Sequence, residues 1–510
     1  MGDGVAVLVL SLPFLGVGAA ALRAGFLSHE HAHLVEKALL VRDRGRLEWI
    51  GFAYPPLPVL LLLPWPAPEA AVLWAGLLGG LLAWGVWRRL EVLSFPRGVR
   101  ALMLLAAMAT PTNLFLASQR LGMMLFLVLF FWACRWYLAF TREGRTDAGF
   151  LAALIIGFAF YASFYAPAFA LAFALATPLF TRPRSLWHGM ALGLVLLFPA
   201  AMTVGAWLYL AWLFTGQPLG FLYDPGSSLL IAFRPDEAFG TPGAMARELA
   251  ARLVGSPLYL GVGVLIARYQ PRRLPAYGIP LGLTMAAWSL GWAFPRELGA
   301  ALWTLFALSG LPARTPRRLW PLVLALALLH IPMDARMARR GEVARWWAVV
   351  FDGQEAALER VERSLAEGLA RRPCGSVLAD DRSAYRIIAQ ARTACPFVLP
   401  ADPVFELALS QPAAFVDAVL VAEGAGGWIG PLEARYRRRP PRGFGLAATW
   451  PGWRLYQRLP QGGAFRVTAG CSSPFGRRET EGLAVRPLAP VARPAGPPPR
   501  PRPCAPAWPG

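Results

Sequence analysis

Long apolar runs separated by short polar segments dominate the first 335 residues of the chain. Because a helix of about 20 apolar residues crosses the hydrocarbon core of a bilayer, these runs predict about eleven membrane-spanning helices. The stretch from 149 to 180 is interrupted near Pro167 and fits either one long helix or two short ones. The runs lie at residues 4–22, 57–87, 101–117, 121–140, 149–163, 165–180, 189–214, 254–267, 276–294, 298–312 and 319–333.

The pattern changes after this transmembrane region, residues 1–335. Residues 336–372 read as a charged helical connector, and strand-like and helical segments then alternate through 373–469, which predicts a small α/β domain. A parallel sheet of about four strands is expected, formed by residues 375–380, 396–400, 416–423 and 453–459. The Pro- and Arg-rich residues 470–510 carry too few apolar side chains to form a core and are predicted to be a disordered tail.

The composition supports a membrane protein. Of the 510 residues, 56% are hydrophobic and 16% are charged, whereas a soluble domain carries about 25% charged residues. The net charge of +20 comes from arginine, since Lys37 is the only lysine. These basic residues do not form one face and accompany no aromatic binding module, so no nucleic-acid partner is indicated.

The arginines also predict the orientation in a cytoplasmic (inner) membrane. They follow the second, fourth, sixth, eighth and tenth runs, and the positive-inside rule places those segments in the cytoplasm. The N-terminus is then cytoplasmic, while residues 23–56, residues 215–253 and the α/β domain face outward. The first run lacks a basic leader and a cleavage site, so we expect a retained anchor. The predicted fold class is an α-helical polytopic membrane protein with a small C-terminal extracytoplasmic α/β domain.

Two of the outward cysteines precede strand-like runs. Cys374 and Cys395 are favoured as a disulfide pair because disulfides persist outside the cytoplasm. Spacing alone does not fix the connectivity, so free buried thiols remain the alternative.

The first outward loop contains a short metal-site pattern. His29-Glu30-His31-Ala32-His33 matches the H-E-x-x-H zinc-peptidase signature, and Glu36 follows at a spacing that suits a third ligand. Against a zinc peptidase, no peptidase-like domain surrounds the motif, and the residues belong to a longer pattern.

That longer pattern runs through residues 28–58. An acidic residue just after the first span opens an amphipathic helix, Gly45 breaks it, and Tyr54-Pro55-Pro56-Leu57 leads into the second span. This arrangement resembles the C-type glycosyltransferases (the GT-C superfamily), integral membrane enzymes that use polyprenyl-phosphate-linked sugars. The resemblance implies a helical membrane fold, often with an outward α/β domain. It also allows a divalent cation in the site, which the sequence itself does not demand.

The resemblance implies a hexosyl- or pentosyltransferase. The sugar would move from a polyprenyl-phosphate donor to an extracytoplasmic acceptor, which is a cell-envelope glycan, a lipid or a protein. The family's Asp-Glu pair is replaced by His29-Glu30, so Glu30 is the expected general base, with His29 as a possible partner in that role. The candidates for binding substrate, with cations for the departing phosphate among them, are His33, Tyr54, Arg120, Asp224 and Arg234.

A protein without catalytic activity is the alternative. A membrane scaffold or a transporter would explain the departure from the family's acidic pair. Transport is less favoured, because no internal repeat is evident and few charges fall within the apolar runs.

Overall fold

The computed structural model describes most of the chain up to residue 459. The described residues are 2–143, 145–180, 186–223, 227, 242–271, 274–289, 296–312, 316–339, 341–423 and 430–459. One compact unit extends from Met1 to Pro460. The predicted tail, 470–510, lies outside the described residues.

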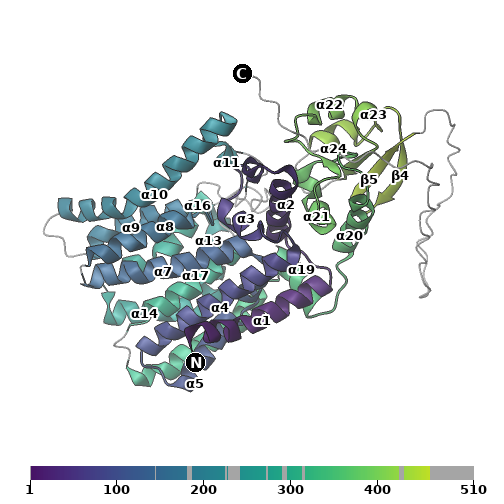
Figure 1. The fold of residues 1–510 in the computed structure, drawn as a ribbon. Coiled ribbons are helices and arrows are strands. Elements are labelled where there is room, and N and C mark those ends of the chain that lie inside the picture. The colour runs from purple at the N-terminus through teal and green to yellow at the C-terminus, as the bar shows by residue number, and fades with distance from the viewer. Residues whose placement is uncertain are drawn as a thin grey trace. The chain divides into compact units, whose positions relative to one another are not determined.

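The first helices pack side by side at close range (Figure 1). A Cβ added at Gly80 of α4 would lie 2.0 Å from Ser11 Oγ and 2.7 Å from Val7 O of α1, so glycine is required for this approach. Helix α4 also contacts α6 and α7. The elements of this part are α1 (Asp3–Arg23), α2 (His29–Arg44), η1 (Leu47–Ile50), α3 (Pro56–Leu62), α4 (Pro68–Val92), α5 (Arg97–Met108), α6 (Pro111–Gln119) and α7 (Leu121–Glu143).

The middle of the chain is also helical, and α7, α8, α9 and α10 pack against one another in sequence. The stretch 149–180 forms two helices, α8 and α9, rather than one. The elements here are α8 (Thr146–Ala159), α9 (Ala166–Phe180), α10 (Leu186–Thr215), α11 (Gly220–Tyr223), α13 (Pro242–Gly255), α14 (Pro257–Tyr269), α15 (Leu274–Tyr277), α16 (Ile279–Ser289), α17 (Arg296–Gly310), η4 (Arg317–Leu319) and α18 (Trp320–Met337).

Within the described part of the chain, five helices are long and apolar enough to cross a membrane. The number rises to seven if each of two sharply bent pairs, α5 with α6 and α13 with α14, is one broken span. The protein is therefore a multi-pass membrane protein with five to seven candidate spans. The sequence-based number of about eleven stays a prediction, because it counts shorter apolar helices such as α8 and α9 as full spans.

The C-terminal region is a mixed α/β structure. Its sheet has five strands in the order β2-β1-β3-β5-β4. Strand β1 pairs in parallel with β2 and β3, whereas β5 pairs antiparallel with β3 and β4. The elements are α19 (Gly341–Val350), α20 (Ala357–Ala370), β1 (Val377–Leu378), α21 (Asp381–Ala391), β2 (Phe397–Val398), α22 (Phe405–Ser410), α23 (Pro412–Phe415), β3 (Ala418–Ala422), α24 (Pro431–Tyr436), β4 (Phe444–Trp450) and β5 (Trp453–Arg458).

The predicted all-parallel, four-stranded sheet was therefore wrong in two respects. Strand β4 was missed because its side chains are mostly exposed and show no apolar alternation. Strand β5 runs antiparallel because only Pro451 and Gly452 separate it from β4, and so short a connection makes a hairpin. Gly452 takes a positive φ of 81° in that turn.

One hydrophobic cluster joins α2, in the segment between α1 and α3, to the C-terminal sheet region. It contains Leu34 and Leu39 of α2, Leu365 of α20, and Ile387 and Ile388 of α21, all almost fully buried. Helix α2 contacts α21 directly. Because these segments bury apolar surface against each other, the C-terminal sheet region packs directly against α2. The boundaries between the predicted connector and the α/β domain stay a prediction.

Cys374 and Cys395 are joined by a disulfide, with their Cα atoms 4.6 Å apart. The bond links the segments that lead into β1 and β2, the two strands that pair in parallel. The disulfide therefore holds together the N-terminal ends of β1 and β2.

Candidate functional site

Helix α2 begins at the motif stretch because Ser28 caps it. The Ser28 hydroxyl accepts a hydrogen bond from His31 N at 3.2 Å, and it donates one to the Gln119 carbonyl at the end of α6. The helix ends at Gly45, whose φ of 72° suits glycine. The cap thus fixes the start of α2 against the junction of α6 and α7.

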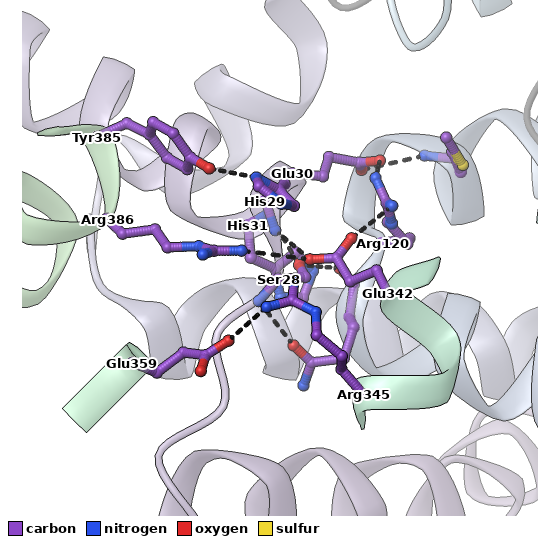
Figure 2. A network of polar contacts seen from close by, with 12 residues as sticks. Ser28, His29, Glu30, His31, Arg120, Glu342, Arg345, Glu359, Tyr385 and Arg386 are labelled. Carbon is purple, nitrogen blue, oxygen red and sulfur yellow. Dashed lines mark hydrogen bonds and ion pairs between the residues drawn. The ribbon is translucent and has the colours of Figure 1, made fainter. Parts of the chain in front are cut away.

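Glu30 points from the first turn of α2 to the N-terminus of α7 (Figure 2). Its Oε1 accepts hydrogen bonds from Gly122 N at 2.6 Å and Met123 N at 3.4 Å. A Cβ at Gly122 would lie 3.1 Å from that oxygen, so glycine leaves room for the carboxylate. The unpaired amides and the dipole of a helix N-terminus favour a negative group here.

Burial raises the pKa of Glu30 above its ordinary value of 4.5. The nearby Arg120 guanidinium and the two amide hydrogen bonds of α7 oppose this rise without cancelling it. A carboxylate with a raised pKa binds a proton more tightly than an exposed glutamate does, which suits a general base.

His31 completes the capping of α7. Its Nε2 accepts the Leu121 amide hydrogen bond at 3.0 Å, which requires a neutral ring with a lone pair on that nitrogen. Burial lowers the pKa of His31 to about 3, so the neutral form is the stable one. His31 is therefore engaged with the backbone of α7.

Arg120 lies between two carboxylates at the start of α7. Its Nη1 is 3.6 Å from Glu30 Oε2, and its Nη2 is 2.6 Å from Glu342 Oε2 on α19 (Figure 2). Both partners are largely buried, which strengthens the attraction between the charges. Arg120 is thus held near the N-terminus of α2 with Glu30 beside it.

Glu342 has two further partners. Its Oε1 accepts a hydrogen bond from the His29 backbone N–H at 2.7 Å and lies 3.7 Å from Arg386 Nη2 on α21. Arg386 is itself buried and lies 3.8 Å from Glu362. Residues from α2, α7, α19 and α21 therefore meet in one polar network.

Tyr385 of α21 contacts both outer histidines of the motif. Its hydroxyl contacts His29 Nδ1, and its ring stacks on His33 with the centroids 3.6 Å apart. The Tyr54 ring also contacts the His33 ring, at a tilt and with the two ring centroids 5.3 Å apart. Burial lowers the pKa of His33 well below its usual value, so this ring is neutral in the stack.

A second group of charges follows on α2. Lys37 Nζ lies 3.0 Å from Asp381 Oδ2 at the start of α21 and 3.5 Å from Glu36 Oε1. Glu36 is fully buried, and this burial raises its pKa to about 8. The Lys37–Asp381 pair adds a charged contact to the apolar packing of α2 on α21.

The structure brings several of the sequence-predicted residues together. Glu30, His29 and Arg120 belong to one network, and His33 packs against both Tyr54 and Tyr385. Asp224 and Arg234 lie outside the described residues. The assignment of roles to these residues stays a prediction.

Sequence reasoning missed Glu342, Tyr385 and Arg386. Glu342 lay in the charged stretch interpreted as a connector, and the other two lay in a helical segment of the predicted α/β domain, where no site residue was expected. Their burial could have been suspected only from the apolar spacing on α21, where Ile387 and Ile388 follow directly.

The geometry of His29, Glu30, His31 and His33 bears on the hypothesis that the H-E-x-x-H motif binds zinc. His33 stacks on Tyr385, Glu30 faces α7, and His31 accepts the Leu121 amide, so the three side chains are used separately. In the described ranges no group of three or more His, Cys, Asp or Glu side chains is arranged to hold a metal ion.

The helix that positions Arg120 is fixed at both ends. At its N-terminus, buried Asp334 of α18 accepts hydrogen bonds from Thr112 N at 2.9 Å and Thr112 Oγ1 at 2.8 Å. At its C-terminus, the Gln119 carbonyl accepts from Ser28. Helix α6 therefore connects the transmembrane helices to the start of α2.

No protein-family model matches the chain. No curated protein matches it either. Among solved structures, it is similar to ArnT from Cupriavidus metallidurans, whose crystal structure has undecaprenyl phosphate bound. The TM-score is 0.55 at 14% sequence identity, over 89% of this chain and 98% of ArnT. The chain has an ArnT-like fold.

This ArnT-like fold confirms the resemblance inferred from residues 28–58 at the level of architecture, since 89% of the chain is aligned. At this low identity the likeness establishes the fold alone, and the substrate follows only as a proposal.

Proposed function

We propose that the chain is a membrane glycosyltransferase that moves a sugar from a polyprenyl-phosphate donor to an extracytoplasmic acceptor. The ArnT-like fold supports this function, together with the Glu30 carboxylate of the first outward loop and the Arg120 guanidinium between α6 and α7, which lie side by side and largely buried. The distribution of arginines supports an N-terminus in the cytoplasm and a site on the outer side of the inner membrane. A cell-envelope glycan, lipid or protein is the proposed acceptor.

The observation that carries the proposal is the pairing of Glu30 with Arg120. In the proposed reaction, an acceptor hydroxyl oxygen bonds to the anomeric carbon of the sugar while the bond from that carbon to the phosphate oxygen breaks. Glu30 Oε2 takes the hydroxyl proton, and Oε1 stays hydrogen-bonded to α7. The electron pair of the broken bond remains on the phosphate oxygen, where Arg120 stabilises the negative charge.

The neighbouring side chains have supporting roles in this proposal. The Tyr385 hydroxyl contacts His29 Nδ1, and the Tyr385 ring stacks on His33, which Tyr54 contacts at a tilt; His33 and Tyr54 are proposed to bind the sugar or the acceptor. Asp224 and Arg234 are proposed to bind substrate from the following outward loop. The eleven-span topology belongs to the same proposal, since it places these loops on one side.

The decisive test compares Glu30→Gln with Glu48→Gln. Glu48 lies on the same loop but is exposed and pairs only with Arg46 among the contacts described. Glutamine at position 30 still accepts the α7 amides but is no base, so we expect turnover of an undecaprenyl-phosphate sugar to fall by about 100-fold or more. Glu48→Gln should keep wild-type turnover.

A scaffold function is the second candidate, because Glu30 Oε1 caps α7 as a purely structural residue would. Full turnover in Glu30→Gln would refute the base assignment. A wild-type protein that consumes no polyprenyl-phosphate sugar, whatever the acceptor offered, would favour the scaffold.

A further inference from the structure

Two hydrogen-bond donors and a third, more distant cationic group surround the Glu342 carboxylate. The first is the backbone N–H of His29, the first residue of the 16-residue helix α2. The other two are the guanidinium groups of Arg120 and Arg386, at 2.6 Å and 3.7 Å. We call these three groups the anion cradle.

The anion cradle has the composition of a phosphate site. Helix N-termini bind phosphate through their free amides and dipole, and arginine pairs with phosphate through a planar fork of donors. The α2 amide, Arg120 and Arg386 come from parts of the chain that are more than 80 residues apart in sequence. Folding therefore assembles the cradle from three separate segments.

Arg386 carries buried N–H groups that donate no hydrogen bond. The side chain is 4% exposed, yet its Nε and Nη2 atoms are buried without a hydrogen bond. Its carboxylate neighbours, Glu342 and Glu362, lie at 3.7 and 3.8 Å, beyond good hydrogen-bond distance. A buried arginine with unused donors is costly unless another acceptor arrives. A phosphate, with more oxygens than a carboxylate, would use them.

Glu342, the group that occupies the anion cradle, stands near the start of a helix. It is second in α19, directly after Gly341, whose φ of 68° lies in the left-handed region that favours glycine. A rotation at this helix start would withdraw the carboxylate without moving α2, α7 or α21.

We propose that Glu342 is an internal substitute for a phosphate: it occupies the anion cradle until the phosphate of a polyprenyl-phosphate ligand displaces it. This inference rests on the proposed function, because it takes the ligand class from there. The cradle adjoins Glu30 through Arg120, so a phosphate seated there places the sugar-bearing bond next to the proposed base. Displacement of Glu342 would also release Arg120 from its closest carboxylate.

The test measures the affinity of undecaprenyl phosphate for the full-length protein in nanodiscs, with undecaprenol as the lipid without phosphate. Glu342→Gln keeps the shape of the side chain and an acceptor for the His29 amide but removes the competing charge. We expect about tenfold tighter binding of undecaprenyl phosphate and unchanged binding of undecaprenol. Glu359→Gln is the matched control, since Glu359 is equally buried but pairs with Arg345.

The Arg386→Gln substitution in the Glu342→Gln background should reverse the gain, because it removes the donors meant for the phosphate. If Glu342→Gln does not fold, Glu342→Asp replaces it, and its shorter carboxylate should give a smaller gain in the same direction. Equal or weaker binding by the position-342 variant, or an equal gain in Glu359→Gln, overturns the inference. Absence of undecaprenyl phosphate binding in every protein, wild type included, overturns the proposed function as well.

Discussion

The contact between Arg120 and Glu342 gives a prediction that depends on no assumption about substrate. The two side chains approach to 2.6 Å and are only 16% and 6% exposed. Replacing one partner of a buried ion pair leaves the other charge without compensation, which costs about 3–5 kcal/mol. Arg120→Gln should cost this amount, because it leaves both Glu342 and Glu30 without their guanidinium.

The double variant Arg120→Gln/Glu342→Gln should be less unstable than the sum of the single variants. Removing the carboxylate together with its partner avoids the uncompensated charge, so we expect a coupling free energy of about 2 kcal/mol. Glu30, Arg386 and the His29 amide remain in place and limit the recovery.

The assay is a double-mutant cycle from reversible unfolding in detergent micelles, followed by loss of helical circular dichroism. The exposed pair Arg46 and Glu48 serves as the control cycle and should show almost no coupling. Additive effects at positions 120 and 342, within about 0.5 kcal/mol, would refute the claim that the pair is buried and coupled.

Two further predictions follow from the pKa of Glu30 and from the disulfide. A base must be deprotonated, so transfer activity should fall as the pH falls through the pKa of Glu30, and burial places this limb of the kcat/KM profile above pH 4.5. A limb at or below pH 4.5 would contradict the environment described for Glu30. Replacing both Cys374 and Cys395 by Ser should lower the free energy of unfolding by about 3 kcal/mol, because the bond closes a loop with a sequence separation of 21. Unchanged denaturant midpoints, measured with and without reductant, would show that the bond adds no stability.

The segment from residue 28 to residue 58 was the most predictable part of the site. The sequence predicted an amphipathic helix that Gly45 breaks, and α2 ends at Gly45 in the structure, while its start is capped by Ser28. Glu30 was singled out because a carboxylate must open the loop in the resembled family. Local sequence signals therefore located one side of the network.

The other side of the network depends on contacts between distant segments. Glu342 and His29 are 313 residues apart, and Tyr385 and His29 are 356 residues apart. No periodicity or motif in one sequence encodes which buried surface α21 will meet. The hydrophobic spacing of α21 predicted a helix with a buried face, but its partner, α2, emerged only in the structure.

The sheet also contains elements that the sequence alone did not predict. Buried strands such as β3 are visible as continuous apolar runs, whereas the exposed β4 has no such signal. The direction of β5 was misjudged because β4 was missed: β4 directly precedes β5 in a tight hairpin, which makes the two strands antiparallel.

The most direct test of the account locates the binding site of the donor's phosphate on the protein. Undecaprenyl phosphate carrying a photoreactive group next to its phosphate can be cross-linked to the protein in native membranes, and the labelled peptides can be mapped by mass spectrometry. The account predicts labelling around residues 28–36 and 120–123, with a marked decrease in Arg120→Gln. Labelling confined to segments away from α2, α7 and α21, unaffected by that substitution, would contradict it.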